Sequence, residues 1–273
     1  MKVLSLTNRL YSRIVRLPFG WKTRRFLSNF VNLLIRKYQR QTESTQIYSD
    51  LEANGYAVLG KLSTEDTEHL TRLVRENLGK EEVNETDPDL NTGIFYADEK
   101  SLIDDPGFRA IILQKRIKNI ADSYLRSNSS IIGCSAWLSR ATDHRQSVNA
   151  QNFHRDIDTI RWLKVFIYLT DVNELNGPHI FVPKSHKNNH YKKYARLTEA
   201  DLLEKGLSPT EIYGEAGTIL VVDTFGIHRG KPVVDNERLL AQVTFGTLPV
   251  VYKKYPLVNN IPKAEHHLWS YYL

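Results

Sequence analysis

The stretch Asn152–Val172 reads NFHRDIDTIRWLKVFIYLTDV, and it is the part of the chain from which the fold can be worked out. Its second half is an apolar run that predicts a long β-strand over residues 159–172. Four polar residues lie immediately before this strand: His154, Arg155, Asp156 and Asp158. Aspartate and arginine are poor strand formers, so their placement here indicates a chemical role rather than a folding role.

From residue 130 onward, apolar side chains recur with a period of two, which is typical of half-buried strands. The expected strands cover residues 131–141, 159–172, 179–183, 217–223 and 238–246. Turn-forming residues, including Asn176-Gly177-Pro178, separate these runs. The pattern favours an antiparallel β-barrel or sandwich.

Upstream of the strands the pattern is mainly helical. After a short strand at 56–59, Ser63 is the expected N-cap of a helix that carries Asp66 three residues later and ends at Gly79. A polar loop is expected over 84–93, followed by one amphipathic helix over 105–125. Helices followed by a run of strands indicate an α+β fold.

Length and composition are those of one globular domain. The chain has 273 residues, of which 41% are hydrophobic and 25% charged, and barrels reach this size as single units. We therefore expect one domain over residues 46–273, with a helical insertion at 187–213 that is a candidate lid. Cys134 is the one cysteine, which excludes an intramolecular disulfide and fits a reducing, cytoplasmic compartment.

Residues 1–45 form a separate basic, amphipathic segment. They carry ten Lys/Arg and one acidic residue, which leaves 27 of the 37 basic and 30 of the 31 acidic residues to the rest of the chain. The apolar runs are too short for a secretory signal or a membrane span. Two alternatives stay open: the segment anchors the protein peripherally on the inner face of an anionic membrane, or it packs on the domain. Nucleic acid is disfavoured because the remaining chain is acidic and shows no recognition motif.

The polar cluster suggests a metal site. In an extended chain His154 and Asp156 point to the same side, about 6–7 Å apart along the strand. His228, which follows the strand at 217–223, can supply a third ligand. Two histidines and one carboxylate form the facial triad of non-haem Fe(II) oxygenases, which leaves positions open for a cosubstrate and oxygen.

Arg238 lies ten residues after His228, at the start of the last strand. If that strand pairs beside the strand leading to His228, its guanidinium lies next to the metal and can clamp a carboxylate. A chelating 2-oxo acid requires such an arrangement.

Three blocks of sequence resemble the phytanoyl-CoA dioxygenase family of Fe(II)- and 2-oxoglutarate-dependent oxygenases. They are FHRDID (153–158), NGPHIFVPKSH (176–186) and DTFGIHRGKPVVDNER (223–238), with Lys184 where the family usually has glycine. The resemblance implies a double-stranded β-helix (jelly-roll, cupin-like) core flanked by N-terminal helices. It covers roughly residues 130–248.

The same resemblance implies residue roles and a reaction. His154, Asp156 and His228 would bind Fe(II), and Arg238 would pair with the distal carboxylate of 2-oxoglutarate. Lys164 falls where relatives place a polar contact to 2-oxoglutarate, and Thr170 shares its strand face. Related halogenases lack the carboxylate, so its presence implies hydroxylation, with O₂ as the second cosubstrate.

Other side chains near the blocks have less specific expectations. Asp158 is expected to orient a ligand or pair with Arg161. Arg155 and Arg229 either form outward ion pairs or reach an anionic substrate, while His179 and His186 are expected to be structural.

Two other classes of function remain as alternatives. One is a non-catalytic jelly-roll binding or scaffold protein, and the other is a metal-dependent cupin enzyme that does not use 2-oxoglutarate. The substrate of an oxygenase would be a small molecule or a lipid or glycan. The basic N-terminal segment favours a lipid-linked or cell-envelope saccharide, such as an acidic sugar, at a membrane surface.

Overall fold

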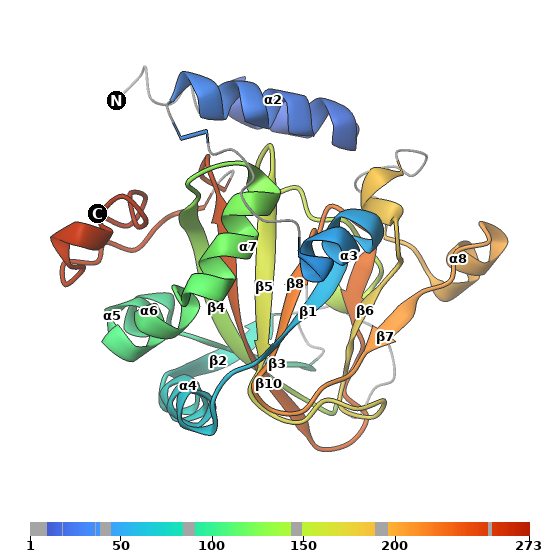
Figure 1. Ribbon diagram of the computed structural model, residues 1–273. Coiled ribbons are helices and arrows are strands. Elements are labelled where there is room, and N and C mark those ends of the chain that lie inside the picture. The colour runs from blue at the N-terminus through green and yellow to red at the C-terminus, as the bar shows by residue number, and fades with distance from the viewer. Residues whose placement is uncertain are drawn as a thin grey trace.

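The computed structural model describes residues 10–17, 19–35, 37–38, 45–83, 91–142, 149–188, 196–250 and 253–273. Two antiparallel sheets face each other, and helices cover the outer face of the larger one (Figure 1). This arrangement confirms the expected α+β fold with a jelly-roll core.

The larger sheet has seven strands in the order β1-β8-β5-β10-β4-β3-β2. Their bounds are β1 (Tyr56–Lys61), β8 (Thr218–Val222), β5 (Trp162–Tyr168), β10 (Glu237–Gly246), β4 (Ser130–Arg140), β3 (Asn91–Ala97) and β2 (Leu78–Val83). The smaller sheet has three strands in the order β7-β6-β9, which are β7 (Thr210–Ile212), β6 (His179–Phe181) and β9 (His228–Gly230).

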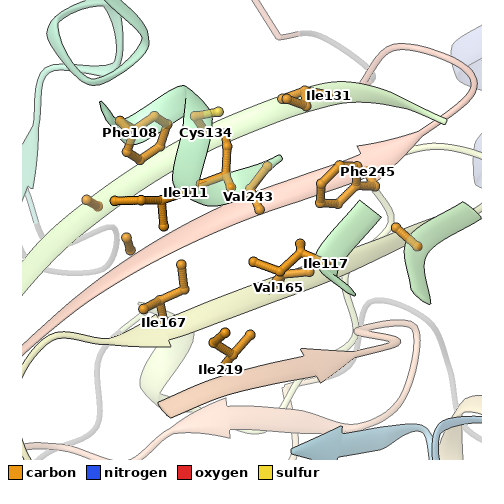
Figure 2. Close-up of a cluster of buried hydrophobic side chains, with 14 of the residues drawn as sticks. Phe108, Ile111, Ile117, Ile131, Cys134, Val165, Ile167, Ile219, Val243 and Phe245 are labelled. Atoms are coloured by element: carbon orange, nitrogen blue, oxygen red, sulfur yellow. The ribbon is translucent and has the colours of Figure 1, made fainter. Parts of the chain in front are cut away.

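The helices come mostly before β4 in the chain. They are α2 (Trp21–Leu34), α3 (Gln46–Asn54), α4 (Thr64–Glu76), α5 (Glu99–Asp104), α6 (Pro106–Ile112), α7 (Lys115–Leu125) and, after β6, α8 (Glu199–Glu204). Short 3₁₀ turns are η1 (Asn149–Gln151), η2 (Ser185–Lys187) and η3 (Lys263–Glu265). Figure 2 shows Phe108, Ile111 and Ile117 of these helices against side chains of the large sheet.

The alternation along β5 separates the hydrophobic core from the interior of the jelly roll. Leu163, Val165 and Ile167 belong to the core beneath the helices. Phe166 and Tyr168 belong to a second cluster that includes Phe181 of the small sheet. Because neighbouring side chains in a strand point to opposite faces, every second residue of β5 faces the space between the sheets. This periodicity places the functional side chains.

Several expected boundaries need correction. Ser63 caps α4 as expected, its hydroxyl accepting from the Asp66 N–H at 3.1 Å, but the helix ends at Glu76 and Gly79 lies inside β2. The Asp66 carboxylate accepts a hydrogen bond from Gln114 instead of closing a capping box. The loop expected at 84–93 lies outside the described residues over 84–90, and its last three residues begin β3.

The single helix expected over 105–125 is in fact two helices, α6 and α7. Gln114 between them is extended, with φ −47° and ψ 136°. The bend lets both helices bury apolar side chains, Phe108 in α6 and Ile117 in α7, in the same core. Helical periodicity alone does not reveal such a break, because each half keeps its own apolar stripe.

The insertion expected at 187–213 is described only in part, and residues 210–212 at its end form a strand rather than a helix. Residues 189–195 lie outside the described residues, α8 is the one helix in the described part, and β7 belongs to the small sheet. The expected strand at 159–172 is β5, which covers 162–168.

The first and the last described segments of the chain both pack on the jelly roll. Tyr11 donates to the carbonyl of Pro249 at 2.8 Å, and Arg24 of α2 donates to the carbonyls of Thr159 and Ile160. Near the C-terminus, Trp269 and Tyr272 are fully buried in the core. Among the residues that the structure describes, no helix has the length and apolarity that a bilayer crossing requires.

Candidate metal centre

Backbone hydrogen bonds bring His154, Asp156 and His228 together. His154 and His228 form an isolated antiparallel bridge, in which each N–H donates to the other carbonyl at 2.9 and 3.0 Å. The Asp156 N–H donates to the carbonyl of Thr224 at 2.9 Å. One ligand atom from each of the three side chains lies within 4.8 Å of the others. His154 and Asp156 therefore lie close together, as expected, although Asp156 follows the bridge in irregular chain rather than in a strand.

Both imidazoles are oriented for ligation through Nε2. Nδ1 of His154 lies 2.8 Å from the carbonyl of Asn152, and Nδ1 of His228 lies 3.0 Å from the carbonyl of Gly226. A carbonyl can only accept, so each Nδ1 carries the proton and each Nε2 presents a lone pair. These Nε2 atoms lie 3.4 and 3.5 Å from the carboxylate oxygens of Asp156. Metal-binding histidines typically donate their other ring N–H to a carbonyl in this way, so the donor set fits a divalent iron.

A buried lysine neutralises the acidic side of the centre. Lys164 Nζ lies 2.7 Å from Asp156 Oδ2 and 3.0 Å from Asp158 Oδ2. Burial alone would raise the pKa of Asp156, but the charge of Lys164 holds it well below its usual range. Burial and the charge of Asp156 raise the pKa of Asp158. Burial would lower the pKa of Lys164, but the two carboxylates raise it, so this ammonium stays charged. Asp158 was expected to pair with Arg161, but its ion pair in the structure is with Lys164.

The three side chains line a cavity of about 250 Å³. Lys164, Phe166 and Tyr168 line it from β5, and Trp137 and Gln242 line it from β4 and β10. Burial raises the pKa of the Tyr168 hydroxyl to about 12. Its hydroxyl donates to the carbonyl of Ile212 at 2.8 Å, which ties β5 to the small sheet.

Arg238 also lines the cavity, but it does so by a different route from the one expected. β10 pairs with β4 and β5, not with the strand that leads to His228. Instead the side chain crosses to the small sheet, donates to the carbonyl of Gly177 and lies against Gly230, where an added Cβ would be 3.2 Å from Nη2. Burial lowers the pKa of Arg238. No carboxylate of the described chain forms an ion pair with it, which leaves a buried cation facing the cavity.

Thr170 and the two other arginines do not line the cavity. The Thr170 hydroxyl accepts from the Leu239 N–H at 3.1 Å. Arg155 is buried and donates to the carbonyls of Phe225, Ser185 and Asn188. Arg229 pairs with Glu199.

His179 does line the cavity, although the sequence suggested only a structural role. Its ring stacks on that of His228, with centroids 5.5 Å apart, and it also contacts Phe166. Burial, His228 and Arg238 hold its pKa well below the usual value, so the ring is neutral. Nε2 of His179 is buried and has no hydrogen-bond partner among the residues that the structure describes. The alternation of side chains along β6 would have shown that His179 faces the cavity, since His179 shares a strand face with the inward-pointing Phe181.

Several solved structures share this fold, and two of them are enzymes that bind or depend on α-ketoglutarate. The epimerase SnoN, in complex with Fe³⁺, α-ketoglutarate and nogalamycin RO, is 17% identical with a TM-score of 0.59, over 74% of this chain and 82% of that one. The non-heme α-ketoglutarate-dependent carbocyclase SnoK is 14% identical with a TM-score of 0.59, over 86% and 93%. EctD from S. alaskensis with bound Fe is 17% identical with a TM-score of 0.58, over 77% and 80%. No curated protein sequence matches this chain significantly.

The fold and the arrangement of two histidines, one carboxylate and a buried arginine define an oxygenase-type enzyme that depends on iron and 2-oxoglutarate. Residues 51–234 match the profile of the phytanoyl-CoA dioxygenase (PhyH) family, and the chain belongs to this family. The resemblance noted in the sequence is confirmed. Arg238 lies just beyond the matched range, so its assignment depends on the geometry described above.

Proposed function

We propose that the protein is a hydroxylase in which His154, Asp156 and His228 hold Fe(II) and Arg238 holds the distal carboxylate of 2-oxoglutarate. The observation that carries this proposal is that the three candidate ligands and the buried guanidinium of Arg238 line the same cavity. That guanidinium has no acidic partner within the described chain, although a buried cation is stable only when it is paired. A dicarboxylate cosubstrate supplies the missing charge.

The side chains around the centre have separate tasks. The Asn152 and Gly226 carbonyls fix the tautomers of the two histidines, and Lys164 holds Asp156 ionised. Lys164 can also approach the cosubstrate, since it lines the same cavity. With O₂ as the second cosubstrate, bound iron and 2-oxoglutarate would supply an oxidant, because O₂ oxidatively decarboxylates 2-oxoglutarate to succinate and CO₂. The apolar walls from Phe166, Trp137 and Leu240 would exclude water from it. Nothing in the structure supports a cosubstrate contact for Thr170.

The proposed substrate is a lipid-linked or cell-envelope saccharide with an acidic group, met on the inner face of a membrane. Two features support this choice. Trp137 and Tyr96 offer aromatic faces, and Ser135 and Gln242 offer polar atoms beside the centre, as sugar recognition requires. The N-terminal segment also presents apolar side chains outward on α2, as argued below.

Two alternatives are less well supported. A scaffold that had lost catalysis would not need to keep both histidine tautomers, the carboxylate and Arg238 together. A cupin enzyme that uses no acid cosubstrate has no reason to bury an unpaired guanidinium in the metal cavity.

Anaerobic titration with Fe(II) and then 2-oxoglutarate tests the proposal. We expect a weak visible metal-to-ligand charge-transfer band that needs both additions and is absent from the His154→Ala variant. The exposed His267 provides a matched control, because His267→Ala removes an imidazole remote from the cavity. If well-folded protein gave no band, the 2-oxoglutarate assignment would be rejected. Succinate release then serves to screen acidic saccharides.

A further inference from the structure

Helix α2 packs on the jelly roll with its polar side inward. Its buried side chains are those of Arg24, Ser28 and Asn32, which follow one another at intervals of four residues. Arg24 donates to the carbonyls of Val15, Thr159 and Ile160 at 2.7 to 3.2 Å and lies over the ring of Phe225. Asn32 donates to the carbonyls of Leu125 and Arg126. These buried contacts fix the rotation of the helix about its axis.

The opposite side of α2 is apolar and faces outward. We call this surface the outer face; it consists of Phe26, Phe30, Leu33 and Leu34. Their exposed fractions are 69%, 51%, 64% and 65%. Figure 1 shows α2 as the outermost element at the top of the molecule. A globular helix normally buries this stripe, so a continuous exposed one indicates a contact with an apolar environment.

Charge identifies that environment. Residues 1–42 contain ten Lys/Arg and not one Asp or Glu. Lys22 is exposed on the turn that precedes Phe26, and Arg13 is exposed in the helical turn before α2. An apolar stripe with basic residues around it fits the interface of an anionic bilayer, where the side chains enter the acyl boundary and the cations meet phosphates. A second copy of the chain is a poorer partner, because it would bring two strongly basic segments together.

We propose that the outer face of α2 docks the protein on an anionic lipid surface, with Phe26, Phe30, Leu33 and Leu34 inserted. The proposal resolves the two alternatives for the N-terminal segment: its polar side packs on the enzyme and its apolar side contacts lipid. It provides the membrane contact for the proposed function, but it does not depend on the catalytic assignment.

Vesicle co-sedimentation of the full chain tests this proposal without any measurement of catalysis. The probes are vesicles of phosphatidylcholine alone and of phosphatidylcholine with phosphatidylglycerol. We expect binding to the anionic vesicles that weakens in high salt. The Phe30→Ser/Leu33→Ser variant should bind at least about tenfold more weakly, because two large apolar side chains are lost from the lipid contact. The matched control is Leu203→Ser on α8, whose side chain is 81% exposed, and it should bind like the parent protein.

Two further measurements keep the result interpretable. Metal binding by the α2 variant should equal that of the parent, which shows that the enzyme is still folded. Lys22→Glu should weaken binding to anionic vesicles only. Equal binding by the parent and the α2 variant, or no binding to anionic vesicles, overturns the proposal. A dimer in light scattering that the α2 variant converts to a monomer also overturns it, in favour of self-association.

Discussion

The ammonium of Lys164 lies 2.7 Å from Oδ2 of Asp156, the carboxylate that faces Nε2 of both His154 and His228. Lys164 therefore contacts the proposed iron ligand directly. A carboxylate held by a fixed cation keeps its orientation and its charge when the metal is absent, so the site is prepared for binding.

Replacing Lys164 with methionine should weaken metal binding about 10- to 100-fold, as loss of a side chain that holds a metal ligand in place typically does. The variant keeps a long side chain in the cavity but leaves Asp156 without its cation. Titration calorimetry with Co(II) measures the effect. Lys118→Met, which breaks the ion pair with Asp122 on α7, is the control. A higher KM for 2-oxoglutarate with unchanged metal affinity would instead place Lys164 on the cosubstrate.

Arg238→Ala should raise the KM for 2-oxoglutarate by at least about thirtyfold, because a buried charge-assisted clamp contributes about 2–5 kcal/mol. The KM of Arg238→Lys should lie between those of the parent protein and Arg238→Ala, since lysine keeps the charge but not the planar guanidinium. Succinate release against 2-oxoglutarate concentration gives both values. Arg140→Ala, an exposed arginine at the end of β4, should behave like the parent protein. Normal saturation in Arg238→Ala would remove this residue from the site.

His179→Phe should keep the flat ring beside His228 while it removes both nitrogens. We expect kcat/KM for 2-oxoglutarate to fall at least about tenfold, because a hydrogen bond to a charged ligand contributes about 1.5–3 kcal/mol. Metal affinity should be unchanged. Succinate release gives kcat/KM for 2-oxoglutarate, and titration with Co(II) gives the metal affinity. An unaltered kcat/KM would show that the His179 ring has only a packing role.

The C-terminal segment should be essential for stability. Trp269 is fully buried in the main core, so Trp269→Ala should lower the free energy of unfolding by about 3–5 kcal/mol. Urea denaturation measures the change. His267→Ala, two residues earlier and exposed, should leave the midpoint within about 0.5 kcal/mol of the parent. Equal midpoints would show that the segment detaches freely from the barrel.

Stability should depend on pH through His186. Burial lowers the pKa of this histidine below its ordinary value of 6.5, so the unfolded chain binds more protons than the folded protein. Its contribution is therefore complete above pH 6.5 and is lost as the pH falls toward the folded pKa. His186→Gln should reduce the slope of unfolding free energy against pH in this window, by at most about 1.4 kcal/mol per pH unit. Parallel curves for both proteins would contradict the assignment.

Much of the site could be predicted from the sequence. The three blocks predicted that His154, Asp156 and His228 lie together, and the structure brings one ligand atom of each within 4.8 Å of the others. Lys164, expected on the same strand face as Phe166 and Tyr168, lines the same cavity. These inferences depend on local geometry, in which side-chain direction follows from chain position. The break between α6 and α7 and the pairing of β2 with β3 were missed, because neither leaves a periodic signal.

Pairing between distant segments was not predictable in the same way. The sequence suggested that Arg238 reaches the metal from a strand next to the one that leads to His228. In the structure the Arg238 side chain instead crosses from the large sheet to Gly177 and Gly230 on the opposite side of the jelly roll. The ion pairs of Lys164 with Asp156 and Asp158 were likewise not predicted from the sequence.

The sequence by itself determined the class of enzyme, through three motif blocks, and the amphipathic character of residues 1–45, through the helical spacing of apolar side chains. Only the tertiary structure decided which side of α2 is buried. The carbonyls of Thr159 and Ile160 need a donor, and Arg24 supplies it, so the polar side turns inward and Phe26 and Leu33 face outward. A helical pattern specifies two faces, but the partners that satisfy buried polar groups determine their orientation.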